Sequence, residues 1–456
     1  MKFIGRQAEL ALLEQHYRDA RSALIPIYGR RRVGKSRLID EFIKDKPNIY
    51  FLGKRTTAEL QLRDFRDAAG LRLPDEALKH AVFRDWQSAL QTVTRLWKDK
   101  GKLVLVLDEL QWTAEASPEL PSILLALWET EWAKRKDIMV ILCGSHVGFM
   151  EREILGEKSP LFGRRGDQIK LGPLSYPEAA LMLPHYSATD RAGVYFLVGG
   201  VPAYLERFVP GRSLHEAIAE EFCSELKFFA LEPHFLIREE LRDPSRYFAI
   251  LTWLAEQRMR QKELAEQSHI ESKVLAGYLN TMLELGYIAK AYPVVAGKVN
   301  PQQVLYEVAD PLLCFWFRFI FPNLQLCRPG QEQTVFSQCI QPQLDSYFGK
   351  RFEKLCQESL MEDYRKRKII WEHVGRYWDK NIELDVVGIR RDRWIDMGEC
   401  KWGTLKSLQE VGQSLEVKSA RYPNAEGASI GKHIYLRTPV SRQIEGIQMH
   451  TLSDMF

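Results

Sequence analysis

Residues 29–36 form the feature that most restricts what this chain can fold into. They are Gly-Arg-Arg-Arg-Val-Gly-Lys-Ser, which matches GxxxxGK[ST] at every fixed position. An apolar segment at 24–28 precedes the match, and a helical pattern opens near Gly34. Glycines let successive backbone amides wrap a phosphate at a helix N-terminus, where the helix dipole also favours negative charge. A strand, this loop and a helix therefore predict a P-loop nucleotide-binding domain.

The residues of this loop have separate expected roles. Lys35 brings a positive charge to the β and γ phosphates of a nucleotide, and the Ser36 hydroxyl is a ligand for Mg²⁺. The alternative interpretation, a glycine turn with an unrelated lysine, is disfavoured by the strand before the loop and the helix after it. The nucleotide-binding residues expected from the loop are Gly29, Arg32, Val33, Gly34, Lys35, Ser36 and Arg37.

Two further apolar segments end in polar residues. The segment 102–107 (KLVLVL) is followed by Asp108 and Glu109. We expect Asp108 to hold Mg²⁺ through water and Glu109 to polarise the attacking water. The segment 138–143 (IMVILC) is followed by Ser145, which we expect to sense the γ-phosphate, with a plain turn as the alternative. Strands separated by helices predict a parallel sheet in an α/β fold.

Length and charge restrict the remaining possibilities. A chain of 456 residues exceeds one ordinary domain. With 64 Lys and Arg against 60 Asp and Glu, the formal charge of +4 excludes binding to nucleic acid through bulk charge alone. Seven cysteines without a CxxC pair predict reduced thiols rather than a zinc site or disulfide framework. The most apolar run, 311–326, is interrupted by Arg318 and predicts a buried helix. We therefore expect a cytoplasmic protein that does not enter the membrane.

The segments that follow the P-loop region differ in pattern. Helical patterns dominate from 173 to 243, and three helix-like segments followed by an alternating one predict a winged helix-turn-helix. Its third helix carries Lys273 against Glu271 and Glu284, which favours an internal arm over a sequence-specific DNA reader. The expected divisions are 1–172 (P-loop core), 173–243 (helical lid), 244–300 (winged helix), 301–345 (linking helices) and 346–456 (a small α/β domain).

A second group of charged residues lies near the C-terminus. Asp385 belongs to one predicted strand, and Glu399 and Lys401 share one face of the next. A hairpin between the strands would bring Asp385 to this pair, and Glu353 on the preceding helix could add a third carboxylate. Two carboxylates can hold Mg²⁺ at a scissile phosphate while a lysine positions or deprotonates water. The alternative is a surface ion pair on a binding domain.

Several motifs in order resemble the archaeal-type ATPase family, a branch of the STAND division of AAA-like P-loop NTPases. They are Phe3–Arg6, YGRRRVGKS, LDELQW, GSH, LFGRR (161–165) and GGVPAYL (199–205). The resemblance covers about 1–290 and implies ATP and Mg²⁺ as cofactors. It implies that Ile4, Gly5 and Arg6 pack near the adenine and that Pro202 helps to close the site. It also implies that Arg164, or the adjacent Arg165, touches the γ-phosphate from its own subunit or from a neighbouring one in a homo-oligomer.

The C-terminal arrangement of Asp385, Glu399 and Lys401 resembles the PD-(D/E)xK restriction-endonuclease-like superfamily, although no proline precedes Asp385. This resemblance implies a Mg²⁺-dependent nuclease-like domain that acts on nucleic acid, with DNA the expected type. The basic runs 365–368 and 390–393 provide local positive charge for a phosphate backbone. The alternative function is a signalling or regulatory ATPase whose C-terminal domain only binds nucleic acid or a protein partner. A DNA-binding transcription regulator would need a basic third helix, which this chain lacks.

Overall fold

The computed structural model describes residues 3–73, 75–98, 101–156, 167–297, 303–405, 407–440 and 442–455. The predicted arginines Arg164 and Arg165 lie outside these residues. The chain divides into two compact units. Unit 1 comprises 1–174 with 201–203, and unit 2 comprises 175–200 with 204–456.

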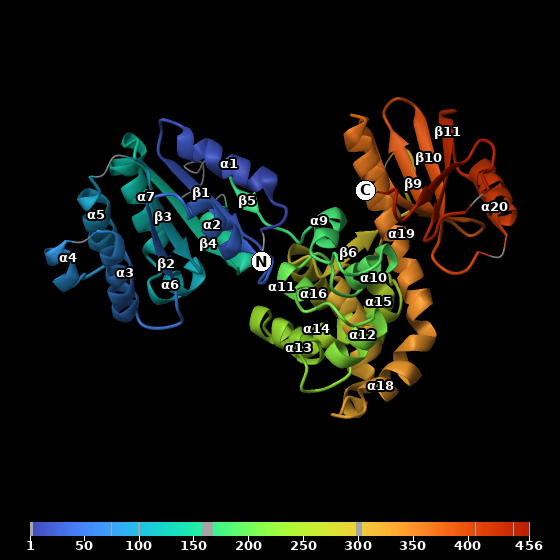
Figure 1. Cartoon of the computed structure of the whole chain (residues 1–456), viewed down its shortest axis with the longest axis horizontal. Coiled ribbons are helices and arrows are strands. Elements are labelled where there is room, and N and C mark those ends of the chain that lie inside the picture. The colour runs from blue at the N-terminus through green and yellow to red at the C-terminus, as the bar shows by residue number, and fades with distance from the viewer. Residues whose placement is uncertain are drawn as a thin grey trace. The chain divides into compact units, whose positions relative to one another are not determined.

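Unit 1 is built on a five-stranded parallel sheet with the strand order β2-β3-β4-β1-β5 (Figure 1). The three apolar segments predicted as strands are confirmed, and all their residues are buried. The short strands β2 and β5 were not predicted, because each has buried residues at only some positions. The strands are β1 (Ala23–Tyr28), β2 (Asn48–Leu52), β3 (Leu103–Asp108), β4 (Ile138–Gly144) and β5 (Ile169–Lys170).

Helices surround this sheet, and the α/β class predicted for the N-terminal part is therefore correct. The predicted helix after the loop is α2, which begins at Lys35, directly after the left-handed Gly34. Its apolar residues join a core with alternate residues of β1, β3 and β4. The helices of unit 1 are α1 (Gln7–Arg18), α2 (Lys35–Ile43), α3 (Ala58–Arg72), α4 (Glu76–His80), α5 (Trp86–Leu96), α6 (Leu110–Ala116), α7 (Leu120–Thr130) and α8 (Val147–Phe149).

The first part of unit 2 is helical and leads into a winged helix-turn-helix. Helices α14, α15 and α16 are followed by the two antiparallel strands β6 and β7, which form the wing. Gly286, which follows the third helix, has a left-handed conformation that ends it. The elements are α9 (Tyr176–Leu181), α10 (Ala188–Val198), α11 (Pro202–Leu205), α12 (Leu214–Phe222), α13 (Phe228–Glu240), α14 (Pro244–Glu256), α15 (Gln261–Ser268), α16 (Ser272–Glu284), β6 (Ile288–Ala291) and β7 (Leu305–Val308).

The apolar run 311–326 is buried in its first half, but it is not one regular helix. It begins as α17 (Pro311–Phe315), continues as a π-helical turn (Trp316–Ile320) and ends as a 3₁₀ helix (Phe321–Leu326). Pro322 lacks the amide hydrogen that a continuing α-helix requires. Helix α18 (Glu332–Val335) follows. Among the helices in the described part of the chain, none has both the length and the apolarity that crossing a bilayer requires.

The C-terminal part of unit 2 contains a second five-stranded sheet with the strand order β12-β11-β10-β9-β8. It is a mixed sheet, with both parallel and antiparallel pairs. Figure 1 shows α19 on one side of this sheet and α20 on the other. Tyr364 and Leu360 of α19 contact the sheet at Gly388, whereas Leu415 of α20 packs with Met397. The elements are α19 (Gln341–Lys366), β8 (Trp371–Trp378), β9 (Glu383–Arg390), β10 (Trp394–Lys401), α20 (Leu408–Arg421), β11 (Ser429–Leu436) and β12 (Gln448–Thr451).

Candidate functional site

The loop between β1 and α2 has the backbone that phosphate binding requires. Gly29, Arg32 and Gly34 all have positive φ angles, of 155°, 67° and 94°. A Cβ atom at Gly29 would lie 2.1 Å from the carbonyl oxygen of Leu171, so only glycine fits there. The Lys35 ammonium is buried and donates to the carbonyl oxygens of Gly29 (2.8 Å) and Arg30 (2.9 Å). The loop therefore curls around its own lysine, and Val33 is buried beneath it.

Asp108 lies at the end of β3 and receives hydrogen bonds from two other elements. The Ser36 hydroxyl donates to Oδ2 of Asp108 at 2.9 Å, and the Tyr50 hydroxyl of β2 donates to the same oxygen. The other oxygen, Oδ1, accepts from the backbone amide of Glu109 at 2.8 Å. Burial, and next the charge of Asp108, raise the pKa of Tyr50, so its hydroxyl remains a donor at neutral pH. The structure thus brings together the two residues predicted as Mg²⁺ ligands in this unit.

Glu109 and Ser145 also meet, as their positions after β3 and β4 predict. The Ser145 hydroxyl donates to Oε2 of Glu109 at 2.6 Å. The amide nitrogen of Gln111 donates to the same carboxylate oxygen and to the Ser145 hydroxyl, the latter at 3.2 Å. Glu109 has a left-handed backbone (φ 50°), which turns the chain from β3 into α6. One oxygen of the Glu109 carboxylate is therefore held by two donors within unit 1.

The N-terminal residues predicted to lie near the adenine adjoin the loop. Arg6 is buried, and its guanidinium donates to the carbonyl oxygens of Val33 (3.3 Å) and Gly172. Gly5 has a left-handed backbone (φ 72°), and Ile4 beside it is half-buried. Pro202 belongs to unit 1, and its ring lies 3.7 Å from the position of a Cβ atom on Gly34. Both predicted flanking segments thus reach the loop, while the side chain of Arg37 is exposed.

In unit 2, the predicted hairpin brings Asp385 to Glu399. Strands β9 and β10 are antiparallel and pair Val387 with Met397 and Val386 with Gly398, so one further step places Asp385 opposite Glu399. The backbone amide of Cys400 donates to Oδ2 of Asp385 at 2.8 Å. Burial, and next the Glu399 charge, raise the pKa of Asp385 to about 6. The two carboxyl groups therefore interact electrostatically inside the domain.

Glu399 is held by two lysines. Lys401 donates to Oε2 at 3.0 Å and Lys418 of α20 donates to Oε1 at 2.5 Å, while the Glu399 side chain is 3% exposed. The pairing with Glu399 raises the pKa of Lys401 against the opposing effect of burial, so this lysine is charged at neutral pH. Glu399 and Lys401 line a cavity of about 350 Å³ that also reaches Asp345 and Ser407, the residue that caps α20.

Glu353 does not join this pair through hydrogen bonds. Its carboxylate forms an ion pair with Arg376 of β8, and it lines a different cavity. Burial, and next the charge of Asp385, nevertheless raise the pKa of Glu353. Within the described residues, no group of three or more His, Cys, Asp and Glu side chains is arranged to hold a metal ion. The predicted three-carboxylate arrangement is therefore absent from this part of the chain, because Arg376 holds Glu353 elsewhere.

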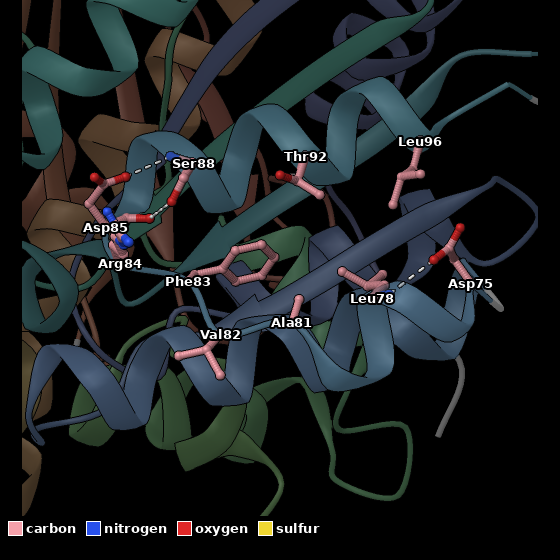
Figure 2. Close-up of a pocket in the computed structure, with 10 residues that line it drawn as sticks. All are labelled: Asp75, Leu78, Ala81, Val82, Phe83, Arg84, Asp85, Ser88, Thr92 and Leu96. Atoms are coloured by element: carbon pink, nitrogen blue, oxygen red, sulfur yellow. Dashed lines mark hydrogen bonds between the residues drawn. The ribbon is translucent and has the colours of Figure 1, made fainter.

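Unit 1 contains a cavity that none of the predicted site residues lines. It measures about 550 Å³ and lies between α4 and α5 (Figure 2). Phe83 points into its centre between Leu78 and Thr92, and Asp85 caps α5 at the amide of Ser88. Its wall combines apolar side chains with helix-capping groups that already have hydrogen-bond partners.

The sequence did not reveal three residues that contact the predicted ones. Tyr50 and Lys418 lie on elements whose position in space is decided by packing, and no local motif marks them. Gln111 lies in the LDELQW motif, three residues after Asp108. Gln111 lies in the first turn of the helix that follows β3. A polar side chain at this position can point back toward the end of the strand, so the motif contained a signal for its contact with Glu109.

Comparisons with known proteins found family models that match both parts of the chain. A family model described as an ATPase domain predominantly from Archaea matches residues 3–208. A second model, described as archaeal and bacterial proteins of unknown function, matches residues 316–412. An uncharacterized protein of Methanocaldococcus jannaschii, MJECL04, is 26% identical over 424 residues, covering 91% of this chain and 92% of the relative.

Two shorter or more distant likenesses concern the nucleotide-binding part. The uncharacterized ATP-binding protein MJ0423 of the same archaeon is 46% identical over 44 residues, which are 10% of this chain and 75% of that protein. The solved structure of the Walker-type ATPase PABY2304 of Pyrococcus abyssi aligns with a TM-score of 0.51 at 19% identity, covering 69% of this chain and 96% of that one. Motif, sheet order and these likenesses agree: the chain belongs to the family of P-loop ATPases found predominantly in Archaea.

Proposed function

We propose that this ATPase is a molecular switch whose nucleotide state controls a Mg²⁺-dependent, nuclease-like C-terminal domain that acts on nucleic acid. The observation that carries the nuclease part is the pairing of Asp385 with Glu399 across β9 and β10, with Lys401 beside them at a cavity. Two carboxylates and a charged lysine at the end of two strands are the groups that phosphodiester hydrolysis requires.

The nucleotide site is proposed to use the residues at the carboxyl ends of β1, β3 and β4. When a nucleotide binds, the Lys35 ammonium would leave the carbonyl oxygens of Gly29 and Arg30 and contact the β and γ phosphates. Glu109 is to orient the attacking water, and Ser145, its hydrogen-bond donor, is to respond to the γ-phosphate. The hydroxyl of Ser36 and the carboxylate of Asp108 are hard oxygen ligands that fit Mg²⁺. The metal would neutralise phosphate charge when bound.

The C-terminal residues also fit Mg²⁺ by donor chemistry, since Mg²⁺ commonly takes one or two carboxylates and completes its shell with water. Asp385 and Glu399 would hold it. Lys401 would position the attacking water and offset the charge of the phosphate. Lys418 would have to yield one oxygen of Glu399 to the metal, because it occupies Oε1.

One observation favours a second candidate function, in which the C-terminal domain only binds nucleic acid or a protein. Both oxygens of Glu399 already have lysine partners. A carboxylate with this arrangement can serve as a structural salt bridge that holds no metal. In this case the ATPase would regulate binding rather than cleavage.

Cleavage assays distinguish the two functions. The purified chain is incubated with single- and double-stranded DNA and RNA in the presence of Mg²⁺ or Mn²⁺, with and without ATP. Under the leading proposal, cleavage depends on the metal and is lost in Asp385→Ala and in Lys401→Ala. Glu416→Gln is the matched control, because Glu416 is exposed on α20 and pairs only with Lys432 in the described structure.

Two results would decide against the nuclease assignment. Cleavage that survives both Asp385→Ala and Lys401→Ala would assign the activity to a contaminant. Nucleic-acid binding without cleavage under every metal and nucleotide condition would favour the binding domain.

A further inference from the structure

A cavity of about 930 Å³ lies within unit 2, where the winged helix-turn-helix meets α19 and the C-terminal sheet. Its wall includes Glu307 from the wing strand β7 and Trp378 from β8, and it also includes Glu256 of α14 and Glu383 of β9. Helix α19 contributes Lys350, Arg351, Glu353, Lys354 and Gln357. We call it the junction cavity. Ligand sites for small organic molecules commonly measure about 300–1,000 Å³ and contain a few convergent polar groups. The junction cavity is therefore large enough for a nucleotide-sized compound, and it adjoins both the winged helix and the C-terminal domain.

Three cations of α19 line this cavity. Lys350, Arg351 and Lys354 occupy positions i, i+1 and i+4, so they share one side of the helix. The ammonium of Lys354 is half-buried and makes no hydrogen bond or ion pair with any residue that the structure describes. The guanidinium of Arg351 makes a long hydrogen bond, of 3.4 Å, to the carbonyl oxygen of Ala309. Glu307 and Glu358 thus act on Lys354 through their charges, without a direct hydrogen bond to its ammonium in the described structure.

The carboxylates that surround Lys354 are already engaged. Glu307 forms an ion pair with Arg258 at 2.7 Å, and Glu353 pairs with Arg376. Glu358 accepts a hydrogen bond from Tyr195 and also interacts through its charge with Lys354 and Arg351. Burial, and next the charge of Arg351, lower the pKa of Lys354 despite these acids. Removing a cation from water without a partner costs free energy, which an incoming anion would restore.

We propose that the junction cavity binds a small organic phosphate of nucleotide size, with its phosphate against Lys350, Arg351 and Lys354. The compact ammonium groups and the planar guanidinium suit phosphate oxygens. The ring of Trp378 can stack on a planar base, and the side-chain amides of Gln257 and Asn381 can bind its edge. Such a ligand would join the wing to the C-terminal domain. Neither Asp385 nor Glu399 lines the cavity, although Gln357 in its wall donates to the backbone oxygen of Asp385 at 2.7 Å. The proposal concerns small-ligand binding and requires no cleavage, so it can fail or hold independently of the proposed nuclease function.

Titration calorimetry on the full chain tests this proposal. The Lys35→Ala background weakens phosphate binding at the P-loop, and the probes are inorganic pyrophosphate and the four nucleoside 5′-monophosphates. We expect at least one probe to bind, and Lys354→Met to weaken that binding roughly tenfold or more, because a charge-assisted contact is lost. Lys366→Met is the matched control on the same helix. Lys366 is exposed and lies outside the cavity, so binding should be unchanged.

Thermal unfolding separates loss of the site from loss of the fold. Lys354→Met should be at least as stable as its parent without ligand, because a partly buried ammonium is removed, and the same concentration of probe should raise Tm more in the parent than in the variant. Lys350→Met, an exposed position of the same cavity, provides a second variant with the same expected loss. The proposal is overturned if no probe binds at millimolar concentration, or if binding survives both Lys350→Met and Lys354→Met.

A short single strand of nucleic acid with a 5′ phosphate distinguishes a free ligand from the end of a polymer. Binding of this strand together with a mononucleotide supports the cavity as a phosphate site. Binding of the strand alone, with no binding of any small probe, rejects the small-ligand assignment.

Discussion

The hydroxyl of Ser36 donates a 2.9 Å hydrogen bond to Oδ2 of Asp108, although 72 positions separate the two residues in the chain. Ser36 lies in the first turn of α2, after β1, and Asp108 ends β3. Both strands are parallel members of one sheet, so their carboxyl ends open on the same edge. Two oxygen groups suited to Mg²⁺ are therefore in contact, and several measurements can test what they do.

Substitution of the P-loop lysine should abolish ATP turnover. Lys35→Ala removes the charge expected at the β and γ phosphates, and Asp108→Ala removes the acceptor of Ser36. We expect each variant to lose ATPase activity by a factor on the order of 10² or more. The rate of phosphate release from ATP measures this loss. Lys44→Ala, an exposed lysine just after the end of the same helix, should retain full activity. ATPase activity retained by purified Lys35→Ala would contradict the assigned site.

Tyr50→Phe should raise the Mg²⁺ concentration that ATPase activity requires, because Tyr50 orients the Asp108 carboxylate. Its hydroxyl donates to Oδ2 of Asp108, so Tyr50→Phe loosens the orientation of that carboxylate without removing it. We expect the Mg²⁺ concentration for half-maximal ATPase activity to rise roughly tenfold, a typical effect of losing a hydrogen bond to a metal ligand. Tyr17→Phe, another partly buried tyrosine of unit 1, is the control. An unchanged Mg²⁺ dependence in Tyr50→Phe would mean that Tyr50 has only a packing role.

Lys418 should stabilise Glu399 in the absence of metal. The Glu399 side chain is 3% exposed, and Lys418→Met removes one of its two cationic partners. Leaving a buried charge partly uncompensated should lower the free energy of unfolding by about 1–3 kcal/mol, measured by urea denaturation in EDTA. Mg²⁺ should then raise Tm more in Lys418→Met than in the parent chain, because the freed oxygen is available to the metal. Equal Mg²⁺ effects in both proteins would argue against Glu399 as a ligand.

His450 should make stability depend on pH below neutrality. Burial, and next the neighbouring His433, lower the pKa of His450 to about 4, whereas Asp363, Asp454 and Asp396 act in the opposite direction. The unfolded chain takes up this proton near its ordinary pKa of 6.5, and the folded chain only near 4. The contribution to stability is therefore complete above pH 6.5 and is lost as the pH falls toward 4, by at most ~1.4 kcal/mol per pH unit.

The variant His450→Gln should flatten this dependence. Urea denaturation at several pH values between 4 and 7 measures it for the parent chain and for the variant. His80→Gln, at an exposed position in α4, should keep the parent slope. If the slope in His450→Gln equals that of the parent, another group accounts for the acid sensitivity.

Much of the fold follows from local pattern, although not all of it. The apolar segments that became β1, β3 and β4 are buried over their whole length, which is why their runs stand out in the sequence. Strands β2, β8, β11 and β12 were not predicted, since residues at many of their positions are only partly buried. Helix α19 begins at Gln341, before the expected boundary at residue 346, because its first turns pack within the helical part of unit 2.

The residue types at the strand ends were predictable from local pattern, because GxxxxGKS and the acids after β3 combine particular residues at fixed spacing. It also predicted that a hairpin would bring Asp385 to Glu399, since alternation along antiparallel strands is a local property. The hydrogen-bond and ion-pair partners of these groups, by contrast, come from distant segments and could not be predicted. Tyr50 donates to Asp108, and Lys418 donates to Glu399. Arg376 forms an ion pair with Glu353 at a different cavity. These contacts depend on how separate elements pack, and packing is set by the whole buried core rather than by any one segment.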